Sequence, residues 1–158
     1  MIAQPDSGST PGVIIVGVDG SESSRQALRL AQSMAVNTAS TVEAVRAWVP
    51  HTALGVMAVG PDEVRPTTNP ARDALTNLAA TVTRVFGDER PADLHLSVRQ
   101  GSPAEVLIEA SRTAQLLVVG SRGYGGFAGL LLGSVSSACA QHAHCPVVIM
   151  HGDAAPPV

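Results

Sequence analysis

The sequence contains no lysine, and all ten of its basic residues are arginine. Enzymes that need a primary amine for a Schiff base, a pyridoxal phosphate anchor or a Walker A loop are therefore excluded. Aromatic residues make up 3% of the chain, and its formal net charge is -3. The stacking platforms and the basic surface of nucleic-acid-binding proteins are both missing, so we expect no nucleic-acid partner.

Long apolar runs and cysteines are also scarce. No run approaches the roughly 20 apolar residues of a membrane-spanning helix, and the first residues do not resemble a signal peptide. The two cysteines, Cys139 and Cys145, are too few for a disulfide framework or a zinc cluster, and we expect both to be buried thiols. These absences predict a cytoplasmic protein with no membrane contact. Prolines, glycines and serines mark residues 1–11 and 152–158 as flexible tails around one domain, residues 12–151.

Two kinds of apolar segment alternate along the chain. Short β-branched runs, such as VIIV at residues 13–16, are typical of the buried strands of a parallel sheet. Segments with helical spacing separate them, and three of these open on capping signals: Ser21, Asn69 before Pro70, and Ser102 in an S-x-x-E box. The predicted strands are residues 13–16, 41–48, 94–98, 116–120 and 147–150, and the predicted helices begin after Ser21 and cover residues 70–86, 103–114 and 134–142.

This strict alternation predicts an α/β fold, a Rossmann-like three-layer sandwich of five parallel strands and four helices. The most apolar runs, 13–16 and 116–120, are expected to be central neighbours, which gives the strand order 3-2-1-4-5. Ligands of such sheets bind beyond the carboxyl ends of the strands, where the strand order reverses. The loops after these two runs are GVDGS and GSRGYGGFAGLLLGS. The second loop ends where a helix begins, and a helix N-terminus with nearby backbone N–H groups favours an anion.

Three other motifs fit their families poorly. Gly123, Gly125 and Ala128 match the dinucleotide fingerprint, but no acidic residue follows about 20 positions later to bind a ribose. The HAHC segment at 142–145 lacks the i, i+4 spacing of a helical metal site. Ser121 nearly matches a nucleophile elbow but lacks its first glycine. We therefore predict no metal cluster and no catalytic residue.

The long glycine spacing has a better match. Gly120 and Gly123 are separated by two residues, and nine residues then lead to Gly133 and Ser134. This pattern resembles the G-2x-G-9x-G-S signature of the universal stress protein family, in its ATP-binding branch, and GVDGS resembles the first strand and loop of that family. The resemblance runs from about Val13 to Met150 and includes the order of the elements.

The resemblance implies a site for ATP with magnesium. Glycine allows close backbone approach because it has no Cβ. Asp19 would lie beside the adenine and ribose, as a hydrogen-bonding residue or as a general base, and both roles stay open. Ala47 would touch the adenine through its backbone. The residues that the resemblance places around the ribose and phosphates are Gly120, Gly123, Gly133, Ser134, Val135 and Ser136.

The implied function is a regulatory protein that holds ATP without hydrolysing it efficiently, and so not an enzyme. Rapid phosphoryl transfer needs a Lys or Arg clamp and carboxylate-held magnesium, and the chain has no lysine. The alternatives are a dimeric interaction protein of the same fold that ignores nucleotide, and a cyclic-AMP binder. The last strand is expected at an open sheet edge, and the resemblance implies a homodimer through it. Its residues are Pro146, Val147, Val148, Ile149 and Met150.

Overall fold

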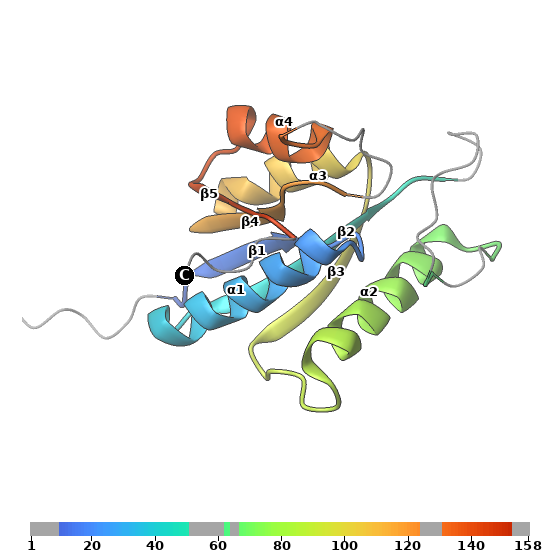
Figure 1. Ribbon diagram of the computed structural model, residues 1–158, viewed down its shortest axis with the longest axis horizontal. Coiled ribbons are helices and arrows are strands. Elements are labelled where there is room, and N and C mark those ends of the chain that lie inside the picture. Colours follow the sequence, from blue (N-terminus) through green and yellow to red (C-terminus); the bar gives the residue numbers. More distant parts are fainter. Residues whose placement is uncertain (1–9, 51–61, 64–66, 124–130, 153–158) are drawn as a thin grey trace, which may run out of the picture.

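Five apolar segments form one parallel sheet in the order β3-β2-β1-β4-β5 (Figure 1). The computed structural model describes residues 10–50, 62–63, 67–123 and 131–152. The predicted fold class and strand order are confirmed. The strands are β1 (Val13–Gly17), β2 (Thr41–Trp48), β3 (Leu94–Gln100), β4 (Leu116–Gly120) and β5 (Val147–Met150).

Helices cover both faces of the sheet. Figure 1 shows α1 and α2 on one face and α3 and α4 on the other. This three-layer arrangement explains why the central strands are apolar on both sides, since neither face meets water. The helices are α1 (Glu22–Thr38), α2 (Pro70–Phe86), α3 (Pro103–Ala110) and α4 (Ser134–His142), and the 3-10 turn η1 (Ser111–Thr113) follows α3.

Two of the predicted caps form and one does not. The side chain of Ser21 accepts from the N–H of Ser24, and that of Asn69 accepts from the N–H of Arg72. Ser102 has the extended backbone of an N-cap, but its side chain makes no capping hydrogen bond. The predicted S-x-x-E box is therefore wrong, and the preset φ of the proline that follows Ser102 is what favours the helix start.

The helix α3 is also shorter than predicted. It ends at Ala110 instead of Ala114, because the chain tightens there into the 3-10 turn η1. The hydroxyl of Ser111, which is fully buried, donates to the carbonyl of Ile108 at 2.6 Å. Such local side-chain bonds compete with the regular helical ladder.

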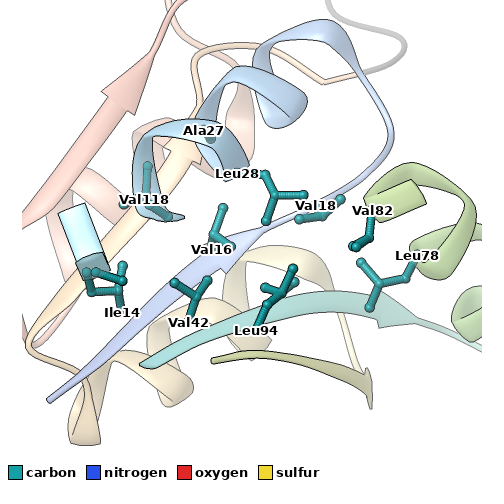
Figure 2. Packing of buried hydrophobic residues seen from close by; sticks show 13 residues of the cluster. Ile14, Val16, Val18, Ala27, Leu28, Val42, Leu78, Val82, Leu94 and Val118 are labelled. Carbon is teal, nitrogen blue, oxygen red and sulfur yellow. The ribbon is translucent and has the colours of Figure 1, made fainter. Parts of the chain in front are cut away.

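Two apolar clusters hold the layers together. On the α1 and α2 side, Ile14 and Val16 of β1 and Val42 of β2 share a cluster with Leu28 of α1 and Leu78 of α2 (Figure 2). Successive residues of a strand face opposite sides, so Ile15 belongs to the second cluster, under α3 and α4. The sheet is therefore fixed from both faces, and its carboxyl edge is a rigid base for the loops that follow the strands.

Candidate functional site

A cavity of about 330 Å³ lies at the carboxyl edge of the sheet, where β1 and β4 end as neighbours. The chain turns from β1 toward β2 on one side and from β4 toward β5 on the other. The cavity therefore occupies the point where the strand order reverses, which is the usual ligand position in parallel α/β sheets. All the residues that the sequence predicted for the site line it: Asp19, Ala47, Gly120, Gly123, Gly133, Ser134, Val135 and Ser136.

One end of the cavity, which we call the α4 end, consists of residues 133–136. Gly133 is the N-cap of α4, and its N–H donates to the carbonyl of Ser121 at 2.7 Å. This bond places the first turn of α4 directly beyond the end of β4. The first N–H groups of a helix have no partner within the helix, and they carry the positive end of its dipole. The α4 end therefore suits an anion.

The two serines of the α4 end have different surroundings. The hydroxyl of Ser136 is buried and donates to the carbonyls of Ser121 at 2.8 Å and Gly133 at 3.1 Å. It fastens the turn, so the hydroxyl that the resemblance assigned to phosphate already has two acceptors. Ser134 is exposed at the start of α4. Its hydroxyl is the one at this end that is open to a ligand.

The three signature glycines have different reasons to be glycine. A Cβ on Gly120 would lie 2.3 Å from Oγ of Ser23 and 2.8 Å from the backbone N of Ser24. Gly120 is therefore required by the packing of α1 on β4. A Cβ on Gly123 would lie 2.2 Å from Oδ2 of Asp19, whereas one on Gly133 would meet nothing closer than 3.5 Å. Of these three glycines, only Gly133 leaves room for a side chain.

Hydrogen bonds hold the loop after β1 in shape and fasten the start of α1 to the loop after β4. Oδ1 of Asp19 accepts from the N–H of Ser21 at 2.9 Å and from its hydroxyl at 2.5 Å. The hydroxyl of Ser23, in the first turn of α1, donates to the carbonyl of Arg122, in the loop after β4, at 2.5 Å. Asp19 therefore hydrogen-bonds within the loop after β1, and its second oxygen, Oδ2, faces Gly123. The carboxylate lies between the two loops that line the cavity.

The opposite end of the cavity, which we call the β2 end, was predicted only through Ala47. Val45 and Ala47 of β2 and Pro103 and Leu107 of α3 line it together with Arg46. The apolar members suit a flat, weakly polar group. The signal that could have found Pro103 and Leu107 is their position at the start of the helix after β3, which faces the same edge of the sheet.

Arg46 was missed because its partner is distant in sequence. Its Nη2 forms an ion pair with Oε1 of Glu63, which lies between β2 and α2 in the chain. Both residues line the cavity, and their side chains are 15% and 14% exposed. No local pattern links a strand residue to such a distant position, so the pair could not be predicted.

Several expectations concern segments outside the described residues. Gly125 and Ala128 of the rejected fingerprint lie there, as do most of the connection between β2 and α2 and most of both tails. Within the described residues there is no group of three or more histidine, cysteine or acidic side chains that could hold a metal ion. None of the helices described is long and apolar enough to cross a membrane.

The two thiols differ in burial. Cys139 on α4 is fully buried, as predicted, and burial raises the pKa of its thiol to about 11. Cys145 is only half-buried, so the prediction of a second buried thiol is wrong. The reason is its place just before the edge strand β5, where one side of the chain has no neighbouring strand in the sheet. Neither cysteine lines the cavity.

Comparison with known proteins gives one consistent family. A profile described as the universal stress protein family matches residues 12–151. A universal stress protein of Mycobacterium tuberculosis is 32% identical over 148 residues, which are 93% of this chain and 50% of that protein. This chain spans about half the length of the curated relatives it matches.

Solved structures of similar fold include members of the same family. A crystal structure described as a universal stress protein in complex with cAMP has a TM-score of 0.57 at 28% identity, covering 92% of this chain and 100% of that chain. The universal stress protein UspA from Lactobacillus plantarum has a TM-score of 0.61 at 19% identity, covering 90% of this chain and 99% of that one, and so shares its fold. The order of strands, the glycine spacing and the match over residues 12–151 lead to one conclusion: the chain belongs to the universal stress protein family.

Proposed function

We propose that this protein binds an adenine nucleotide, preferentially ATP with magnesium, and holds it as a regulatory signal. The observation that carries the proposal is that residues from β2, from the loops after β1 and β4, and from α4 line one cavity at the switch point of the sheet. The complex of a related universal stress protein with cAMP supports an adenine ligand.

The two ends of the cavity match the two halves of such a ligand. The N–H groups of the first turn of α4, with the exposed Ser134, supply donors for phosphate oxygens. The apolar β2 end supplies side chains against which a purine ring can pack, among them Val45 and Leu107. Asp19 lies between them and supplies an acceptor for ribose hydroxyls.

Magnesium would be held mainly by the nucleotide. The acidic residues that line the cavity are Asp19 and Glu63, and each already has an oxygen engaged, by Ser21 and by Arg46. Proteins commonly bind Mg²⁺ through substrate phosphates and one or two side chains. Ser134 is the side chain at the α4 end that fits this role. We therefore expect removal of magnesium to weaken ATP binding and leave adenosine binding unchanged.

Slow turnover follows from the charges at the α4 end. Arg122 is exposed, and Arg46 is paired with Glu63 at the other end of the cavity. A fixed arginine is worth about 10³ to 10⁵ in the rate of phosphoryl transfer. Without one at the phosphates, we expect ATP to stay bound and intact for far longer than in a kinase.

The first experiment is to release and identify the ligand. The protein is purified without added nucleotide, heat-denatured, and the supernatant is analysed for adenine nucleotides; calorimetry with MgATP, GTP and adenosine follows on ligand-free protein. We expect MgATP to bind more tightly than adenosine and GTP more weakly than ATP. No binding of any adenine nucleotide at millimolar concentration would contradict the proposal.

Hydrolysis is tested separately. We expect phosphate release by the purified protein to stay far below the roughly 1 to 100 s⁻¹ typical of kinases. The matched control is Ser134→Ala, which removes the exposed hydroxyl at the α4 end. Turnover near 1 s⁻¹ that disappears in Ser134→Ala would instead make the protein an ATP-hydrolysing enzyme.

Cyclic AMP is a second candidate ligand, and the solved cAMP complex of a relative favours it. It has a single phosphate, so it uses fewer of the donors at the α4 end than ATP does. Competition between labelled cAMP and MgATP separates the two. If cAMP displaces MgATP at equal concentration while ATP fails to displace cAMP, the cyclic nucleotide is the physiological ligand.

The proposal includes a homodimer through β5, which is an edge strand of the sheet. The carbonyls of Pro146 and Met150 accept hydrogen bonds from the β4 side, at Leu117 and Ser121. Polar backbone groups alternate along a parallel strand, so those of Val147 and Ile149 are directed away from β4. A second copy of β5 would satisfy them.

Ile149→Pro tests this pairing, because it removes an outward N–H and leaves the bonds to β4 in place. We expect the wild type to sediment as a dimer at micromolar concentration and Ile149→Pro as a monomer with an unchanged circular dichroism spectrum. An equally tight dimer in the variant would place the interface elsewhere. A wild-type dimer that binds no nucleotide would favour the interaction-protein alternative.

A further inference from the structure

Arg46 lines the cavity, and only one of the two terminal nitrogens of its guanidinium has a partner among the described residues. Nη2 is paired with Glu63, and the two side chains are 15% and 14% exposed. The other terminal nitrogen, Nη1, is buried and has no hydrogen-bond partner among the described residues. Because a guanidinium keeps its charge in proteins, Nη1 stays a strong donor.

An unsatisfied buried donor on a charged group is costly. Structures normally supply such a group with an acceptor from the protein, from water or from a ligand. Arg46 lines the cavity, so an acceptor on a bound molecule can reach the side of the guanidinium that the protein leaves unused. The ion pair with Glu63 fixes the other side, which reduces the entropy lost when Nη1 forms its bond.

The position of Arg46 decides which part of the ligand this would be. β1 lies between β2 and β4, and neighbouring strands are about 4.8 Å apart, so the end of β2 is about 10 Å from the end of β4. The first turn of α4 begins at the end of β4, through the bond from Gly133 to Ser121. Glu63 lies between β2 and α2 in the chain, and α2 covers the opposite face of the sheet from α4 (Figure 1). Arg46 is therefore tethered at the end of the cavity opposite the phosphate donors.

We propose that Arg46 is a specificity-determining residue for the nucleoside half of the ligand. Nη1 donates a charge-assisted hydrogen bond to a ring nitrogen of the purine or to a ribose oxygen. This inference rests on the proposed function and adds to it a residue outside the glycine signature. It predicts that Arg46 contributes equally to the binding of adenosine, AMP and ATP, because all three share the nucleoside.

The variant for the test removes both charges. Arg46→Met alone would remove the positive charge beside the carboxylate of Glu63, which is destabilising in a buried pair, whereas replacing both members of such a pair by apolar residues is often neutral. We therefore compare the wild type with the double variant Arg46→Met/Glu63→Met by calorimetry. The matched control is Arg99→Met/Glu43→Met, which removes an ion pair of 2.6 Å between β3 and β2 that does not line the cavity.

We expect the double variant to lose about tenfold to a hundredfold in affinity for adenosine, AMP and ATP alike, at an unchanged melting temperature. The control pair should keep wild-type affinities. Glu63→Gln keeps a neutral acceptor for the guanidinium and should lose less than about threefold. A loss that grows with the number of phosphates, or no loss, overturns the inference. So does a loss in Glu63→Gln as large as in the double variant, because Arg46 would then act only by holding the connection.

Ligand analogues identify the acceptor. The 1-, 3- and 7-deazaadenosines and the 2′- and 3′-deoxyadenosines each lack one acceptor of the nucleoside. The wild type should bind the analogue that lacks the partner of Nη1 about tenfold more weakly than adenosine. The double variant should bind that analogue and adenosine with equal affinity. If every analogue lowers the affinity of both proteins by the same factor, Arg46 contacts none of these atoms. The inference then fails, while nucleotide binding stands. If the wild type binds no adenine compound, the proposed function fails and the inference with it.

Discussion

The α4 end and the β2 end of the cavity are built from different parts of the protein. The donors of the α4 end are mainly backbone groups, from Gly133 as the N-cap and three further residues of the first helical turn, with the exposed hydroxyl of Ser134 beside them. The β2 end consists of side chains: apolar ones from β2 and α3, and the half-buried pair of Arg46 and Glu63. The first end offers donors whatever its side chains are, whereas the second depends on which residues stand there.

This difference explains what each end can contribute to recognition. Backbone N–H groups at a helix start attract phosphate regardless of what is attached to it. Side chains with fixed donors and apolar faces discriminate between bases and sugars. We therefore infer that the α4 end determines how affinity depends on the number of phosphates in the ligand. The β2 end determines selectivity for the nucleoside.

The largest effect is expected for Gly133→Val. The nearest atoms to a Cβ at this position are 3.5 Å away, so the fold accepts a side chain that fills the space before the first turn of α4. We expect ATP affinity to fall by at least about a hundredfold, or about 2.7 kcal/mol, and adenosine affinity to fall by less than about threefold. Calorimetry with both ligands measures this. Equal losses for adenosine and ATP would break the division between the two ends.

Gly120→Ala should lower the stability of the fold rather than act directly on either end of the cavity. The added Cβ would lie 2.3 Å from Oγ of Ser23 and 2.8 Å from the backbone N of Ser24, so α1 must shift. Overpacking of this kind costs about 1–3 kcal/mol of unfolding free energy. Urea titration measures the cost, with Gly133→Ala as the matched control that meets no close contact. A Gly120→Ala variant as stable as the control would contradict the packing role.

Asp19→Asn should lower the affinities for adenosine and for ATP by the same factor. The amide oxygen of asparagine can still accept from Ser21, which Oδ1 of Asp19 does at 2.9 Å, so the loop after β1 keeps its shape. Charge-assisted hydrogen bonds are about twice as strong as neutral ones. We expect a loss of about tenfold for adenosine and ATP, or about 1.4 kcal/mol, in the same calorimetric assay. A loss confined to ATP would move Asp19 to the phosphate side.

The smallest effect concerns Cys139, which lies on α4 one turn after the residues of the α4 end. Burial raises the pKa of its thiol from 9.0 to about 11. Above pH 9 the unfolded chain loses this proton while the folded protein keeps it, so stability falls as pH rises from 9 to 11. The loss at pH 10 is about 1 kcal/mol relative to pH 8. Since the chain has no lysine, few other groups titrate in this range. Urea titrations of the wild type and Cys139→Ala at both pH values measure the difference, and an equal loss in the variant would assign it to another group.

The same contrast decides how much could be predicted from the sequence. The bounds of β2 and the start of α2 at Pro70 match the structure, because both signals are local. The α4 end was predicted because glycine spacing is visible in the chain. The pair of Arg46 and Glu63 was not, because no local pattern links a strand residue to a position 17 residues further along the chain. The role of Gly120 was also missed, since its reason lies in Ser23 and Ser24, which are far from it in sequence.

The ion pair of Arg46 and Glu63 has a thermodynamic consequence beyond selectivity. If a nucleotide fills the cavity as proposed, the pair would couple its binding to the position of Glu63. Linkage is reciprocal: if a bound nucleotide strengthens the pair by some factor, then a molecule that draws Glu63 away must weaken nucleotide binding by the same factor. A partner at Glu63 would then sense whether the cavity is filled, with no movement of the sheet. The signal would pass through the contact between Arg46 and Glu63.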